Sequence, residues 1–193
     1  MSNDFFALIS RMKYIDRWAL MRNTEKESLS QHSYEVAVIA HALVIISNKR
    51  LGTNYDASKA ALIGLFHDAS EILTGDMPTP VKYYSPEILG AFKKVEEVAT
   101  DKILNMLPAD MQPDYKDLMI SAKEDEDLWR LVKAADKISA LIKCIEEEKA
   151  GNREFTKARE ATEKSIHKMN CEAAEIFMEE FLPSFELTLD QLK

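Results

Sequence analysis

The stretch from Leu65 to Ile72 carries three ionisable side chains inside an otherwise apolar segment. His67 and Asp68 are adjacent, and Glu71 follows them closely. In a helix, residues four apart share a face, so the sequence predicts Glu71 above His67 and Asp68 about a quarter-turn away. Burying such groups is costly unless their charge is compensated, as a metal ion would do. An isolated His-Asp pair more often belongs to a surface helix, so a metal site requires further ligands.

His32 and Asp136 are the candidates for those ligands. His32 belongs to an apolar stripe that continues over residues 36–46 and therefore faces inward, although such a histidine is more often a hydrogen-bonded core residue. Asp136 lies at the edge of another stripe, between Lys133 and Lys137, where a solvated acid is the alternative. Two imidazoles and two carboxylates suit one divalent transition ion such as Co, Mn, Fe or Zn. Four protein ligands on a six-coordinate ion leave positions for water and a phosphate oxygen, as a hydrolase requires.

Helices are expected to position these residues, because apolar residues recur at helical spacing and no segment shows the alternation of a strand. Ser28 and Gln31 have capping-box spacing, and Ser85 precedes a proline at a second helix start. We expect helices over residues 4–13, from 29 onward, 57–73, 85–106, 115–120, 128–151 and 155–181, with a proline-bearing loop at 74–80. The four candidate ligands then lie on three helices of one all-α bundle, a single domain over residues 1–193.

Composition and charge narrow the function classes. The chain has 193 residues, 46% of them hydrophobic, which suits one domain with a substantial core. Its formal net charge of −8 argues against binding nucleic-acid polymers, so local positive charge has to hold any phosphate ester. Cys144 and Cys171 lack metal-binding or redox spacing and are expected to be free thiols. The N-terminus lacks a signal-peptide pattern and the apolar run 36–46 is too short to span a bilayer, so we expect a cytoplasmic protein that does not bind membranes.

The order His32, His67-Asp68, Asp136 resembles the signature of the HD-domain phosphohydrolases, which are all-helical metal enzymes. Within that superfamily the chain is similar to the bacterial 5′-deoxynucleotidases, and the similarity covers nearly its whole length. The motifs that carry this similarity are residues 16–23 (DRWALMRN), 30–33 (SQHS), 67–71 (HDASE), 74–83 (TGDMPTPVKY) and 183–185 (PSF). No motif position departs from the pattern.

The resemblance implies an HD-domain helical bundle that binds one divalent ion through His32, His67, Asp68 and Asp136. It implies metal-dependent hydrolysis of deoxyribonucleoside 5′-monophosphates to deoxynucleoside and phosphate, by a homodimer. Glu71 would activate or orient the attacking water, and Arg17 would clamp the phosphate with its planar guanidinium. The substrate-binding residues would be Arg17, Trp18, Asp68, Asp76, Met77, Pro78, Thr79 and Asp136. Trp18 would press against the sugar and discriminate against a ribose 2′-hydroxyl.

Two alternatives remain open from the sequence. One is an HD hydrolase of another nucleotide phosphoester, such as guanosine tetraphosphate or a cyclic nucleotide. The other is a non-catalytic, nucleotide-binding helical module whose metal is structural. Glu71 favours the enzymes, because a structural site needs no spare carboxylate beside its ligands.

Overall fold

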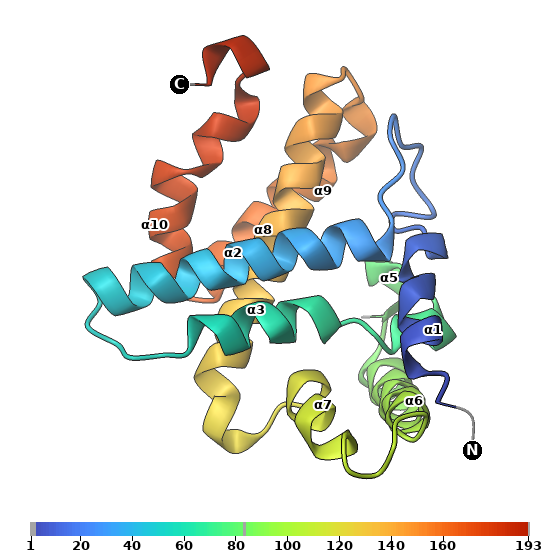
Figure 1. The fold of residues 1–193 in the computed structure, drawn as a ribbon. Coiled ribbons are helices and arrows are strands. Elements are labelled where there is room, and N and C mark those ends of the chain that lie inside the picture. The colour runs from blue at the N-terminus through green and yellow to red at the C-terminus, as the bar shows by residue number, and fades with distance from the viewer. Residues whose placement is uncertain (1–2, 83, 193) are drawn as a thin grey trace.

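The computed structural model describes residues 3–82 and 84–192, so Tyr83, the last residue of the loop motif, lies outside the described part. Within that part the regular structure is helical, which confirms the predicted all-α class (Figure 1). The α-helices are α1 (Phe5–Ile9), α2 (Leu29–Arg50), α3 (Ala57–Phe66), α4 (Glu71–Thr74), α5 (Thr79–Lys82), α6 (Pro86–Leu104), α7 (Gln112–Met119), α8 (Glu126–Lys149), α9 (Thr156–Lys168) and α10 (Glu172–Glu180). Short 3₁₀ helices lie at Ser10–Tyr14, Lys123–Asp125, Arg153–Phe155, Leu182–Glu186 and Leu189–Gln191.

The main core lies where α2 and α3 run antiparallel and α8 crosses them (Figure 1). Fully buried aliphatic side chains from all three helices meet there, among them Leu43, Ile63 and Ile138. Gly64 allows α3 to approach α2 closely, because a Cβ atom at this position would lie 2.8 Å from the Cα of Ala37. The two helices that carry the two candidate histidines are therefore in backbone contact.

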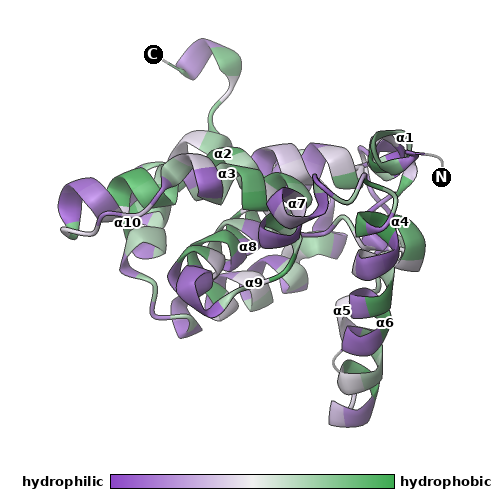
Figure 2. Cartoon of the chain, turned by 60° about the horizontal axis from the view of Figure 1, so that its bottom comes forward, coloured by the Kyte–Doolittle hydropathy of each residue, from purple (hydrophilic) through white to green (hydrophobic). Residues whose placement is uncertain are grey.

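A second, smaller apolar cluster packs α1, α6 and α7 together around Phe5 and Ile103. From this end of the molecule α6 extends away from the bundle with the short helix α5 beside it (Figure 2). Lys82, at the end of α5, donates a 2.9 Å hydrogen bond to Glu96 of α6 and lies over the ring of Phe92. Along the chain, Asp68 lies between Ile63 of the main core and Ala69 of the second cluster, and the candidate site contains Asp68.

Several helix boundaries agree with the sequence prediction. The capping box of Ser28 and Gln31 is confirmed, and the Ser85 side chain caps α6 as expected. Two predicted helices are wrong in extent. The helix expected over 57–73 ends at Phe66, and α4 begins separately at Glu71. The last predicted helix is divided into α9 and α10, because Asn170 between them adopts a left-handed conformation with φ of 49°.

Helix α2 is long and apolar enough, by length and composition alone, to cross a membrane. It is longer than the apolar run 36–46, because the helix also includes the more polar residues on either side of that run. However, 56% of its most apolar window is buried inside the protein, and its inner face forms the core with α3 and α8. Both cysteines are free, as expected, and both are buried.

Candidate active site

Helix α2 places His32 in the interior, where the side chain is fully buried. Its Nε2 atom lies 3.1 Å from Oδ1 of Asp136 on α8 and 3.7 Å from Oδ2 of Asp68. The opposite ring nitrogen, Nδ1, lies 3.0 Å from Oγ of Ser139. His32 is thus a buried polar group whose Nε2 faces two carboxylates and whose Nδ1 faces a hydroxyl.

His67 and Asp68 do not lie inside a continuous helix, and this corrects the sequence prediction. His67 caps the C-terminal end of α3, and its Nδ1 atom lies 2.8 Å from the carbonyl oxygen of Gly64. The backbone after it closes in tighter turns, in which Ala69 N–H bonds to the carbonyl of Phe66. This change of direction lets Asp68 fold back, so that its Oδ2 atom lies 3.0 Å from Nε2 of His67.

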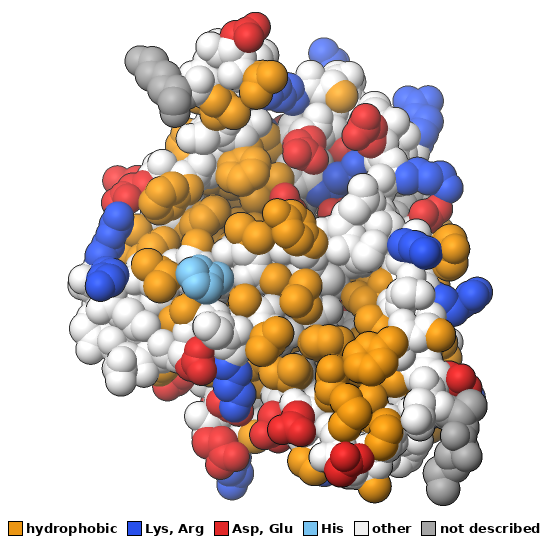
Figure 3. All heavy atoms as spheres, in the orientation of Figure 1, with side chains coloured by type: hydrophobic (Ala, Val, Ile, Leu, Met, Phe, Trp, Pro, Cys, Tyr) orange, Lys and Arg blue, Asp and Glu red, His pale blue; other side chains and the backbone are white. Residues whose placement is uncertain are grey.

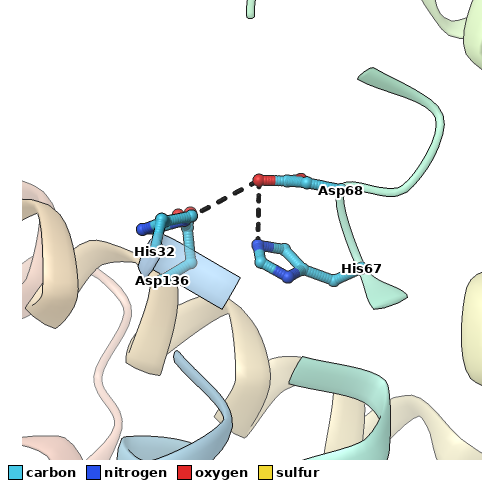
Figure 4. A group of neighbouring side chains, drawn as sticks. All are labelled: His32, His67, Asp68 and Asp136. Atoms are coloured by element: carbon cyan, nitrogen blue, oxygen red, sulfur yellow. Dashed lines mark ion pairs between the residues drawn. The ribbon is translucent and has the colours of Figure 1, made fainter. Parts of the chain in front are cut away.

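The structure brings His32, His67, Asp68 and Asp136 together, with one potential ligand atom from each within 4.8 Å of all the others (Figure 4). The His32 and His67 ring centroids are 5.5 Å apart. Both Nε2 atoms are buried, and neither makes a hydrogen bond of acceptable geometry with the described residues. Buried polar atoms rarely lack a partner, so two of them beside two carboxylates fit a bound cation.

The charges of this cluster are strongly coupled. Burial disfavours charged His67, but the neighbouring Asp68 carboxylate outweighs it and raises the pKa of His67 to about 9. Burial also opposes ionisation of Asp136, yet the adjacent His32 holds its pKa well below the usual range. Burial and the nearby Arg17 guanidinium lower the pKa of His32, which favours the neutral form of this imidazole. A neutral imidazole is the form that binds metals.

Glu71 begins α4 and is 6% exposed. The prediction that it lies on one continuous helix with His67 is wrong, because α3 ends at Phe66 and α4 begins at Glu71. Burial, followed by repulsion from Asp68 and Asp76, raises the pKa of Glu71 to about 9. Its Oε2 atom is buried without a hydrogen-bond partner among the described residues. Glu71 is therefore a buried carboxyl group within electrostatic range of Asp68, and its role with water stays a prediction.

Arg17 approaches the cluster from the segment before α2. Its Nη1 atom lies 3.7 Å from Oδ2 of Asp68, while its Nε donates a 3.0 Å hydrogen bond to Oε2 of Glu27. The same oxygen of Glu27 accepts a 2.9 Å bond from the indole Nε1 of Trp18. Glu27 thus fixes the directions of two predicted substrate-binding side chains at once. No sequence pattern indicates this role, since Glu27 is one of 33 acidic residues.

Trp18 joins the segment before α2 to the loop after α4. Its backbone has φ of 58°, and its N–H donates a 3.2 Å hydrogen bond to Oδ2 of Asp76. Its ring packs 5.3 Å from that of Phe155, so it also covers the core. Asp76 is thus brought beside Arg17 and Trp18. Met77 and Pro78 are half-buried in the same loop and Thr79 is exposed at the start of α5, and their substrate contacts stay predictions.

A buried polar network holds the segment that carries Arg17 and Trp18 against α8. Glu147 is 1% exposed and accepts hydrogen bonds from the N–H and hydroxyl of Thr24, from Nζ of Lys143 and from Nδ2 of Asn152. Lys143 also donates to the carbonyl of Glu25, at 2.7 Å. The network thus ties residues 24–25 to the C-terminal half of α8.

Two further residues that the sequence analysis missed stand behind His32. Ser139 is fully buried and donates a 2.5 Å hydrogen bond to Oε2 of Glu35, which follows His32 by one turn of α2. Burial raises the pKa of Glu35 to about 7. Ser139 could have been found, because it follows Asp136 by three residues and so shares its face of α8.

The helical fold together with a His/His-Asp/Asp cluster defines the class of protein, an HD-domain phosphohydrolase. The family described as 5′-deoxynucleotidase YfbR-like matches residues 4–185. The chain belongs to this family.

Two similar proteins are also named 5′-deoxynucleotidases. The 5′-deoxynucleotidase of Shewanella oneidensis is 48% identical over 187 residues, which are 97% of this chain and 96% of that protein. The 5′-deoxynucleotidase VV1113 of Vibrio vulnificus is 45% identical over 188 residues, 97% of each chain. Among solved structures, an HD-domain phosphohydrolase from Listeria innocua has a TM-score of 0.79 at 26% identity, over 94% of this chain and 88% of that one. The cyanophage S-2L HD phosphohydrolase (DatZ), solved with dA and one catalytic Zn²⁺ ion, has a TM-score of 0.66 at 18% identity, over 94% and 96% of the chains, which shows the fold alone.

Proposed function

We propose that this protein is a divalent-metal-dependent 5′-deoxynucleotidase, which hydrolyses deoxyribonucleoside 5′-monophosphates to deoxynucleoside and phosphate. The observation that carries the proposal is the convergence of two carboxylates, next to Arg17, on two buried imidazole nitrogens that make no well-formed hydrogen bond with the described residues. Family membership supports the substrate class, because the relatives named above are 5′-deoxynucleotidases.

We assign His32, His67, Asp68 and Asp136 as the ligands of one ion, of Co, Mn, Fe or Zn type, because imidazole and carboxylate together suit these metals. A divalent ion held there would polarise the phosphoryl group, acidify the attacking water and favour the ionised form of Glu71. The ligands come from α2, α8 and the turn after α3, so the packing of the bundle fixes their spacing.

Arg17 grips the phosphate in this proposal. Its guanidinium is held by Glu27 and points toward Asp68, and burial does not discharge it, because Asp136 and Glu27 keep its pKa raised. A fixed, planar cation can bind two phosphate oxygens at once. Such a local cation is needed, since the chain as a whole is acidic.

Glu71 takes the proton of the attacking water in the proposed mechanism. It is buried, it is electrostatically coupled to Asp68 and Arg17, and one of its oxygens has no partner among the described residues. A positioned base of this kind typically contributes about 10²–10⁴ in rate.

The sugar and the base of the nucleotide would contact the surface formed by Trp18 and the loop after α4. Trp18 is fixed by Glu27 through its side chain and by Asp76 through its backbone. We propose that its ring excludes a 2′-hydroxyl, that Asp76 accepts a hydrogen bond from a sugar hydroxyl, and that Met77, Pro78 and Thr79 complete the pocket. Asp68 and Asp136 would also border the phosphate.

Phosphate release from dAMP, AMP and 3′-dAMP, measured with EDTA-treated protein and added Co²⁺ or Mn²⁺, tests the function. We expect metal-dependent hydrolysis of dAMP and much slower release from the other two. Equal rates on dAMP and AMP would refute the sugar selectivity. Guanosine tetraphosphate and a cyclic nucleotide are tested by chromatography of the nucleotide product, because opening a cyclic phosphodiester releases no phosphate. Their hydrolysis without dAMP turnover would favour another HD hydrolase. Metal binding without any turnover would favour a structural metal.

We further propose a single HD domain over residues 1–193 that acts in the cytoplasm as a homodimer, without a membrane or nucleic-acid polymer as partner. A groove of about 460 Å³ between α2 and α10 supports a second copy as the occupant, because it is lined by Ile45 and Phe181, both more than 40% exposed. Hydrophobic side chains gather over these helices (Figure 3). Ile45→Glu should convert a dimer into a monomer in light-scattering measurements, and an unchanged mass would exclude this face.

A further inference from the structure

The two candidate histidine ligands both need a proton on Nδ1, so that Nε2 can offer its lone pair to a metal. A neutral imidazole has one N–H donor and one acceptor nitrogen, and the partner of each nitrogen decides which is which. For His67 the backbone makes this decision. Its Nδ1 lies 2.8 Å from the carbonyl oxygen of Gly64, and a carbonyl can only accept a hydrogen bond.

For His32 the decision falls to side chains. Its Nδ1 lies 3.0 Å from Oγ of Ser139, and a hydroxyl can either donate or accept. The hydroxyl has a single proton, however, and it donates this proton to Glu35, whose Oε2 lies 2.5 Å from Oγ. An ionised carboxylate only accepts. The Ser139 proton therefore points to Glu35, and its oxygen is left to accept from Nδ1–H of His32.

We propose that Ser139 and Glu35 are positioning residues that fix His32 in the Nδ1–H tautomer and so keep its Nε2 lone pair directed at the metal site. The inference rests on the proposed metal-binding function and deepens it. The chain of bonds runs in one direction, from the Nδ1–H of the imidazole to the hydroxyl and from the hydroxyl to the carboxylate.

The surroundings of His32 make this control necessary. Ser139 and His32 are both fully buried, so water cannot replace a missing partner. Without an acceptor at Nδ1, the proton can move to Nε2, which lies 3.1 Å from Oδ1 of Asp136 and would gain a strong acceptor there. A proton in that position blocks the lone pair. Removing such outer partners of a ligating histidine typically weakens metal binding 10- to 100-fold.

The test uses two readouts on the full chain, at pH 8.5, where Glu35 is ionised because its pKa of about 7 lies below this pH. The first is the affinity for Co²⁺ or Mn²⁺, from titration against a competing chelator. The second is the tautomer of His32 in metal-free protein, from the ¹⁵N shifts of its ring. The chain has four histidines, and His41→Gln and His167→Gln variants assign the two outside the site.

Ser139→Ala should weaken metal binding 10- to 100-fold and move the His32 proton partly or wholly to Nε2, and Glu35→Gln should shift both readouts in the same direction. Ser139→Thr, which keeps the hydroxyl, should recover most of the affinity. Ser47→Ala is the matched control, because it removes another buried hydroxyl of the bundle, one that bonds to the carbonyl of Leu43. It should change neither readout.

Wild-type affinity and an unchanged tautomer in Ser139→Ala would overturn the proposal. Equal losses in the Ala and Thr variants with an unchanged tautomer would also overturn it, because they would show a packing role. If Ser139→Ala does not fold, Glu35→Gln decides the question, since Glu35 is only half-buried. Failure of the wild-type protein to bind any divalent ion would refute the proposed function instead, while the tautomer in metal-free protein would still test this inference.

Discussion

The buried carboxylate of Glu147 provides the sharpest test of how the segment bearing Arg17 is held in place. We expect Glu147→Gln to destabilise the protein by about 3 kcal/mol at pH 7. The substitution preserves volume but removes the charge, and it turns an acceptor into a donor facing Lys143, Thr24 and Asn152. Breaking one partner of a buried ion pair typically costs about 3–5 kcal/mol.

The pKa of Glu147 gives an independent magnitude. Burial alone would raise this pKa, but the hydrogen bonds from Lys143, Asn152 and Thr24 hold it at about 2, against an ordinary value of 4.5. This difference corresponds to about 3 kcal/mol in favour of the ionised, folded state. Because the folded-state pKa is depressed, this stabilisation is present above pH 4.5 and is lost as the pH falls toward 2. The stability difference between wild type and Glu147→Gln should therefore shrink over that range.

Urea unfolding at several pH values measures both effects. Glu146→Gln is the matched control, because its exposed side chain lies next to Glu147 in the chain and should not lower stability. The Lys143→Met variant should lose less than Glu147→Gln, since Glu147 keeps the donors from Thr24 and Asn152. A Glu147→Gln protein within about 0.5 kcal/mol of wild type at pH 7 would refute the reasoning that this network carries stability.

Four further predictions concern the site. Asp136→Ala should lose bound divalent ion and activity together, and metal analysis that finds full occupancy would contradict its role as a ligand. Glu71→Gln should keep metal and nucleotide binding while turnover falls by about 10²–10⁴, whereas near-normal turnover would make Glu71 a bystander. Trp18→Ala should narrow the ratio of dAMP to AMP hydrolysis, and an unchanged ratio would remove Trp18 from sugar selection. Glu27→Ala should raise KM and narrow the same ratio in one variant, because it releases both Arg17 and Trp18; an effect on KM alone would show that Trp18 is held independently.

The helical fold could be predicted because its signals are local. The capping box at Ser28 and the proline after Ser85 mark helix starts that depend on neighbouring residues alone. The end of α3 could not be predicted in this way. The stretch 57–73 is apolar enough to continue as a helix, but the His67 side chain bonds to the carbonyl of Gly64 and the chain turns. The break at Asn170 was missed because a single residue in a left-handed conformation leaves no mark on hydrophobic spacing.

In the candidate site, too, some residues could be predicted from the sequence and others could not. His32, His67, Asp68 and Asp136 stood out because metal ligands are few in type and their order resembles a known signature. Glu27 holds Arg17 and Trp18, and Ser139, with Glu35 behind it, contacts His32, through tertiary contacts that join parts of the chain 9 to 107 residues apart. No spacing rule predicts such contacts, although the position of Ser139 three residues after Asp136 indicated that the two share a face of α8. The continuous helix predicted over 67–71 is wrong, although it placed Glu71 correctly in the neighbourhood of Asp68.

The close approach at Gly64 makes the two histidines unequal targets for mutation. The orientation of His32 depends on side chains that substitution can alter one at a time. The orientation of His67 depends on a backbone carbonyl, which no substitution removes, and on a residue where any side chain would collide with the backbone of α2. A saturation screen for activity should therefore find Gly64 as intolerant as a metal ligand. Without the structure, the result of such a screen would suggest that Gly64 takes part in the reaction, although glycine has no side chain that could do so.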